Sequence, residues 1–203
     1  MRNNLIYQSS EFDCGPTTLT NALRFLFDRD EVPPHFLKSI WMLCNDVFNE
    51  EGELGKWGTS RGVMRYFGDW TNNYAKGCKF PIKAKYVKKE KAVMTPDGQA
   101  WQCLCEGGCV VMRCWSDGYG HYVLLTGIDD GGNVLIWDPY DEDDELGNPL
   151  VRQDNDHPKQ YNRVVHPSII ERTDVYDYAM GEYSKREMLL MWRTPGECKR
   201  HVW

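Results

Sequence analysis

Apolar residues recur at helical spacing in three segments of the first third of the chain. Over Cys14–Leu26 an apolar side chain returns every third or fourth position, which predicts a helix with one buried face. Pro16 suits its first turn, because the N–H that proline lacks would have no partner there. A second helix is predicted over residues 35–47. A third follows a cap at Thr59 or Ser60 and runs through residue 67.

The middle of the chain changes to strand-like runs. Residues 109–115, 121–128 and Val134–Trp137 are rich in β-branched and other apolar residues, and the glycine-containing turn at 129–132 joins the last two as a hairpin. Before them, residues 79–93 are predicted to be extended and residues 100–104 to form a short helix that ends at two glycines.

Beyond Tyr140 the pattern weakens. Residues 140–161 are acidic and turn-rich, which indicates a surface excursion. Ser184 and Glu187 match a capping box and predict a helix through Trp192. Helices followed by antiparallel strands indicate an α+β fold in one domain over residues 1–203. Its helical part covers about residues 8–70 and its sheet part about 79–139, with a C-terminal extension at 140–203.

Composition narrows the function. The 203 residues carry a formal net charge of −6 at pH 7, which argues against general nucleic-acid binding. The N-terminus lacks the apolar core of a secretory signal, and no apolar run approaches membrane-spanning length. We therefore expect a cytoplasmic protein with no membrane segment, while the sequence does not determine its oligomeric state.

The chain contains eight cysteines, and reduced thiols are expected in a chain without a secretory signal. Cys103, Cys105, Cys109 and Cys114 cluster, but they lack the paired C-x-x-C spacing of a structural zinc site. Cys109 and Cys114 also fall at an odd separation in one predicted strand, so their side chains should face opposite ways. Buried free thiols are favoured over zinc, and no cofactor is expected.

Cys14 stands at the start of the first predicted helix. The positive end of a helix dipole lowers the pKa of a thiol, and only the thiolate is a good nucleophile. Gly15, the next residue, would leave the approach to the sulfur open and let the backbone turn sharply. A buried structural cysteine explains Cys14 equally well when it is considered alone.

His121 and Asp138 lie on the two strands of the predicted hairpin. If the hairpin turns at Asp130 and Gly131, the two become diagonal neighbours on one face, because the side-chain period of a strand is two. A histidine there could take the proton of the thiol, and an aspartate could orient the ring. A three-residue loop or a bulge would separate them.

Attack on a carbonyl also needs hydrogen-bond donors for the developing oxyanion. The backbone N–H of Cys14 and the side-chain amide of Gln8 could supply them. Together, Cys14, His121, Asp138 and Gln8 predict a thiol nucleophile with its base, orienting acid and oxyanion donor.

These residues resemble a known family. Gln8 with Asp13-Cys14-Gly15-Pro16, the strand that begins Gly120-His121-Tyr122, and Asp138-Pro139 are similar to papain-like cysteine peptidases of the bacteriocin-leader-processing type, also called double-glycine leader peptidases. The resemblance implies a papain-like fold, no metal, a peptide or protein substrate, and the four roles given above. The chain departs from the transporter-linked members of that type, because it has no Walker-type loop, and a stand-alone member is expected.

Three functions remain open. A cysteine peptidase would hydrolyse peptide bonds through an acyl-enzyme. An acyltransferase or amide-forming enzyme would use the same residues with another acceptor, and a binding module would keep the scaffold with an idle thiol.

Overall fold

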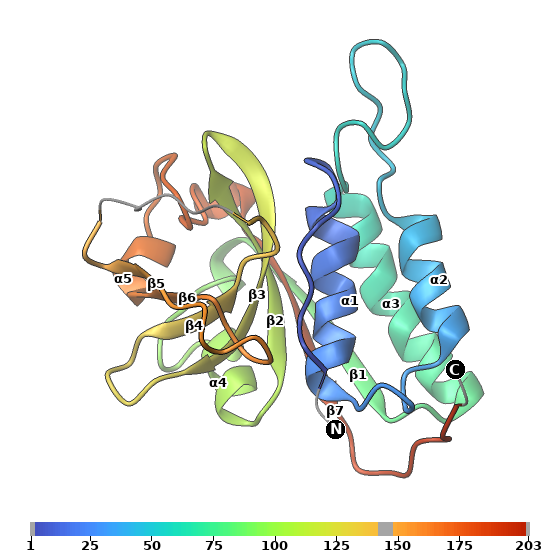
Figure 1. Ribbon diagram of the computed structural model, residues 1–203. Coiled ribbons are helices and arrows are strands. Elements are labelled where there is room, and N and C mark those ends of the chain that lie inside the picture. The colour runs from blue at the N-terminus through green and yellow to red at the C-terminus, as the bar shows by residue number, and fades with distance from the viewer. Residues whose placement is uncertain (1–2, 142–147, 202–203) are drawn as a thin grey trace.

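The computed structural model describes residues 3–141 and 148–201. Its centre is one antiparallel sheet in the order β1-β7-β2-β3-β4-β6-β5 (Figure 1). The strands span β1 (Ile82–Lys88), β2 (Cys109–Ser116), β3 (Tyr119–Ile128), β4 (Val134–Trp137), β5 (Val151–Gln153), β6 (Arg163–Val165) and β7 (Glu187–Arg193).

Helices cover both faces of this sheet. One apolar cluster holds buried residues of α1 (Cys14–Leu26), α2 (Pro34–Leu43) and α3 (Arg61–Cys78) against one face of the strands. The second cluster lies on the other face, with α4 (Gln99–Cys105) and α5 (Pro167–Ile170). Short 3-10 turns occupy Lys89–Lys91 and Tyr183–Lys185. The α+β class is confirmed, with the three N-terminal helices side by side (Figure 1).

The predicted helices are present with changed ends. α1 has the predicted bounds, and its apolar stripe is buried. α2 stops at Leu43 rather than at residue 47, because Cys44 is extended and Asn45 has a positive φ of 58°. α3 follows the Ser60 cap as predicted but continues to Cys78, where Lys79 ends it in the left-handed conformation. The second half of α3 is rich in polar residues, so its apolar spacing is too weak to predict a helix there.

The predicted C-terminal helix is wrong. Glu187–Arg193 forms β7, which pairs with β1 on one side and with β2 on the other. Residues 188–191 are all buried, so both faces of the strand are apolar and no alternation distinguishes it from a helix. The hydroxyl of Ser184 contacts Glu182 instead of forming the expected capping box.

The segment after Tyr140 also contributes to the sheet. Within the predicted surface excursion, residues 142–147 lie outside the described part of the chain, and β5 pairs with β6. β6 in turn pairs with β4. The C-terminal segment therefore supplies β5, β6 and β7 to the same sheet.

The β3–β4 hairpin reaches the predicted register by another route. Its loop spans residues 129–133, one residue longer on the β4 side than a turn at Asp130-Gly131 would need. A β-bulge between Leu125 and Gly127 compensates for that shift, so Leu124 pairs with Trp137 as the predicted turn requires.

Candidate active site

Cys14 is the first residue of α1 and is buried at the helix N-terminus. The helix is fixed on the sheet by Thr18, whose hydroxyl donates to the backbone carbonyl of Tyr122 at 2.9 Å. Gly15 is required for a reason that the sequence did not reveal. A Cβ at this position would lie 2.3 Å from Oγ1 of Thr59, so the loop before α3 packs directly on the glycine.

His121 lies on β3 beside the sulfur. Its Nε2 is 2.7 Å from Oδ1 of Asp138, and both side chains are almost fully buried. The Cys14 thiol lies near the same imidazole, whose hydrogen bonding and charge both act on the pKa of the thiol, so the three predicted side chains come together. Because Asp138 occupies Nε2, Nδ1 is the nitrogen left for the thiol.

The surroundings favour the ionised forms of this set. Burial alone would raise the pKa of Cys14. The hydrogen bond to His121, its positive charge and the backbone N–H groups of Tyr122 and Gly15 outweigh burial and lower that pKa. Burial opposes protonation of His121, but the charge and hydrogen bond of Asp138 raise its pKa above the usual range. His121 in turn keeps the pKa of buried Asp138 low against the effect of desolvation.

Asp138 is itself held from several sides. Oδ2 accepts from the hydroxyl of Tyr178 at 2.8 Å, and Oδ1 accepts from the backbone N–H of Tyr140 at 2.9 Å. Asn162 bonds both backbone groups of Asp138, accepting its N–H at 2.7 Å and donating to its carbonyl at 2.8 Å. Sequence reasoning missed Tyr178 and Asn162, because no motif marks them.

Gln8 lies next to the site through its backbone. Its N–H donates to the carbonyl of Pro139 at 2.8 Å, which ties the N-terminal segment to the turn after Asp138. Its side-chain amide donates to the Ser10 carbonyl at 2.9 Å, while Oε1 is buried and has no hydrogen-bond partner among the described residues. The oxyanion role of Gln8 therefore stays a prediction.

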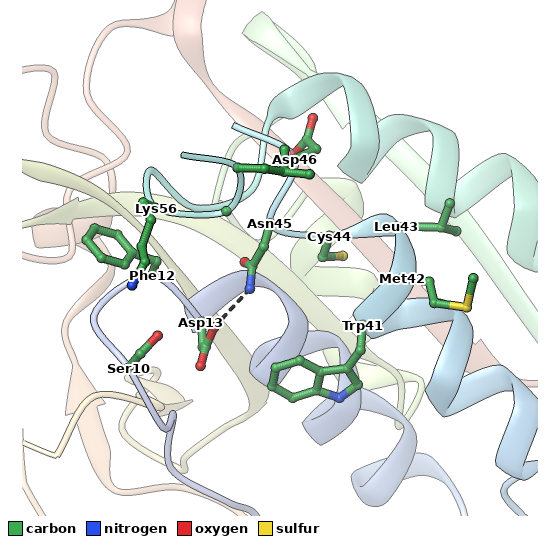
Figure 2. A pocket seen from close by; sticks show the side chains of 12 residues that line it. Ser10, Phe12, Asp13, Trp41, Met42, Leu43, Cys44, Asn45, Asp46 and Lys56 are labelled. Carbon is green, nitrogen blue, oxygen red and sulfur yellow. Dashed lines mark hydrogen bonds between the residues drawn. The ribbon is translucent and has the colours of Figure 1, made fainter. Parts of the chain in front are cut away.

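A hollow of about 470 Å³ lies beside Asp13, the residue before Cys14 (Figure 2). It lies between the loop before α1, the end of α2 and the loop before α3, and Asp13 and Cys44 line it. Figure 2 shows the Asn45 amide reaching across to the Asp13 carboxylate, at 2.9 Å. Exposed Trp41 and Leu54 give the hollow an apolar part.

The remaining thiols differ from Cys14. All eight cysteines are free, and Cys109 and Cys114 belong to the clusters on opposite faces of the sheet, as predicted. Burial, with the charge of Asp46, raises the pKa of Cys44 to about 12. Among residues 3–141 and 148–201, no cluster of histidine, cysteine and acidic side chains is arranged to hold a metal ion.

Comparison with known proteins places this arrangement in a family. The family described as "Peptidase_C39 like" matches residues 4–169, which include Cys14, His121 and Asp138. The chain belongs to this family. The match confirms the resemblance to C39-type peptidases and, with the helices packed on an antiparallel sheet, the papain-like fold. Cysteine peptidase is the general activity that the family indicates, with a peptide or protein as substrate.

Two solved structures are also similar. One is the peptidase domain of Streptococcus mutans ComA, at 14% identity and a TM-score of 0.34. The other is the peptidase domain of Streptococcus ComA, described as a bi-functional ABC transporter in a quorum-sensing pathway, at 16% identity and a TM-score of 0.38. Each alignment covers 68% of this chain and 79% of the other. No curated protein matches the chain. No helix in the described residues has the length and apolarity to cross a bilayer.

Proposed function

We propose that this protein hydrolyses peptide bonds by a Cys-His-Asp mechanism. The Cys14 thiolate attacks the scissile carbonyl and forms an acyl-enzyme. His121 holds the proton taken from the thiol and gives it to the leaving amine, and then activates water for deacylation. Asp138 keeps the ring oriented and stabilises its charged form.

One observation carries this proposal, which is the position of His121 between the Cys14 sulfur and the Asp138 carboxylate. The thiol contact lowers the pKa of Cys14, and the carboxylate raises the pKa of His121. The two shifts act together to favour a thiolate paired with an imidazolium near neutral pH. A buried thiol with a structural role would need neither partner.

The oxyanion donors in this proposal are the backbone N–H of Cys14 and the amide of Gln8. Within the described part of the chain the Gln8 side chain donates one hydrogen bond, to Ser10, and a primary amide carries two N–H groups. Its second N–H is available for the tetrahedral intermediate. The hollow beside Asp13 and Cys44 is large enough for substrate side chains and would receive part of the peptide.

A peptide mixture made by trypsin digestion of a proteome tests the proposal. The protein and its Cys14→Ala variant are incubated with the mixture, and new peptide termini are identified by mass spectrometry. We expect cleavage products with the wild type and none with the variant. Equal product lists would refute the peptidase function, and ligated peptides as the main product would instead support acyl transfer.

A further inference from the structure

Arg113 lies on β2, on the face of the sheet that is covered by α1, α2 and α3. It pairs across β2 and β3 with Tyr122. Tyr122 and Val111 both belong to the apolar cluster that contains Cys14, and Arg113 shares their face because it is two residues from Val111. The side chain of Arg113 therefore belongs to the face of the sheet against which α1 packs.

The guanidinium of Arg113 lies directly over Gly120. A Cβ at Gly120 would be 2.0 Å from one terminal nitrogen of the arginine. The guanidinium can occupy this position only because residue 120 has no side chain. Gly120 is the residue before His121. The positive charge thus lies one residue along β3 from His121, on the face of the sheet whose apolar cluster contains Cys14.

This cation has no anionic partner in the described residues. Buried Arg186 pairs with Glu171, and Arg193 pairs with Glu31, whereas no carboxylate in residues 3–141 or 148–201 forms an ion pair with Arg113. The guanidinium lies over the ring of Trp115, with its carbon 5.7 Å from the ring centroid. Arg113 is half-buried.

We propose that Arg113 is a specificity-determining residue that binds a carboxylate on the leaving-group side of the peptide substrate. This inference rests on the proposed peptidase function. We place this carboxylate on the leaving-group side because Gly120 adjoins His121 on β3, and His121 is the proposed donor of the proton to the leaving amine. A planar guanidinium suits a carboxylate, which it can bind through two parallel hydrogen bonds. The carboxylate is either an acidic side chain or the C-terminus of the peptide.

Three bromoacetyl reagents test this inference without knowledge of the substrate. Bromoacetyl-glutamine amide is neutral, bromoacetyl-glutamate amide carries a side-chain carboxylate, and bromoacetyl-glutamine with a free C-terminus carries a terminal one. In each reaction the Cys14 thiolate displaces bromide and forms a thioether. The rates at Cys14 are measured by peptide mass spectrometry, and each carboxylate reagent is compared with the neutral one.

The readout is the change in that ratio on substitution, because the imidazolium of His121 also attracts anions. In Arg113→Gln we expect the rate ratio of carboxylate to neutral reagent to fall at least about fivefold for the carboxylate that the arginine binds. Arg113→Lys should keep part of the wild-type preference for that carboxylate. Arg65→Gln is the matched control, since it removes the same charge at an exposed position of α3 that lines a different hollow. The reagent that responds identifies the source of the carboxylate.

The outcomes separate the two proposals. If Cys14 reacts rapidly but both ratios in Arg113→Gln stay within about twofold of the wild type, the Arg113 inference is wrong and the peptidase proposal stands. The same fall in Arg65→Gln would also overturn the inference, because it would reflect net charge alone. If wild-type Cys14 reacts with the neutral reagent no faster than Cys198, the proposed function itself fails.

Discussion

Cys14 at the start of α1 and Cys114 on β2 are two buried thiols, and their surroundings shift their pKa values in opposite directions. Cys114 is paired with His121 across β2 and β3, yet burial and the negative charge of Asp138 raise its pKa well above the usual range. Cys14 is also buried, but the His121 ring and backbone N–H groups lower its pKa.

Burial and nearness to a histidine strand therefore do not activate a thiol. The difference arises from which part of the histidine–aspartate pair each sulfur meets. Cys14 meets the imidazole and the start of a helix, while Cys114 experiences the carboxylate inside a closed apolar cluster.

Replacing each of the two cysteines separately should give the largest difference in activity between any two variants. Cys14→Ala should lower peptide hydrolysis at least about a thousandfold, because no other group can form the acyl-enzyme. Cys114→Ala should keep the activity within a few-fold and lower only the thermal stability. Initial rates on a peptide identified as a substrate, with melting curves for both variants, measure the contrast. Comparable activity losses would remove the distinction between the two thiols.

Asp138→Asn tests the charge that acts on both thiols. We expect an activity loss of about a hundredfold, since the ring of His121 loses the carboxylate that orients it and stabilises its charge. The pKa of Cys114 should fall toward its ordinary value at the same time. Alkylation rates of both cysteines against pH provide the measurement, and unchanged rates at Cys14 would show that Asp138 is only structural.

The same carboxylate gives a pH-dependent stability. Its pKa is lowered in the folded protein, so it stabilises the fold fully above the unfolded value of about 4, and this contribution is lost as the pH falls through the folded pKa. Wild type should therefore lose stability faster than Asp138→Asn on acidification below about pH 4, as measured by urea unfolding. Parallel pH curves for the two proteins would contradict this.

Asn162→Ala tests the support of Asp138 from outside the hairpin. The substitution leaves the buried N–H and carbonyl of Asp138 without partners, which costs about 1–3 kcal/mol of unfolding free energy. Activity should fall by about tenfold or less, because the charges of the site remain. Urea unfolding and initial rates are the two readouts, and a fully stable variant would show that Asn162 does not hold the turn.

Tyr178→Phe should have the smallest effect. It removes one hydroxyl donor to Asp138, so the pKa of Asp138 should rise slightly and that of His121 should fall. We expect an activity change of a few-fold, with the alkaline limb of the pH–rate profile shifted to lower pH. A shift in the opposite direction would mean that the hydroxyl does not favour the charged pair.

The sequence identified the parts of this site that lie on strongly patterned elements. The helix with Cys14 and the strands with His121 and Asp138 were predictable, because apolar periodicity is clear there. The hairpin register was correct only because the longer loop and the bulge offset each other. Neither feature has a signature in the residues that would separate it from a simple turn.

The residues that sequence reasoning missed share a physical cause. Asn162 and Tyr178 act through tertiary contacts from a segment without regular apolar spacing. Tyr178 also has a positive φ of 65°, which is unusual for a residue other than glycine and has no signal in the sequence. The spacing of Ser184 and Glu187 predicts a helix where β7 lies, and a strand buried on both faces shows no alternation that would argue against it. Packing between distant segments determines these features, and a local pattern does not contain it.

The pH dependence of Cys14 alkylation by iodoacetamide tests the central claim most directly, in the wild type and in His121→Ala. A thiolate paired with an imidazolium should react rapidly and at nearly constant rate from mildly acidic to neutral pH. In His121→Ala the rate at neutral pH should drop by about a hundredfold and then rise with pH as for a buried thiol. Wild-type Cys14 that instead follows an ordinary thiol titration, unaffected by loss of His121, would contradict the account.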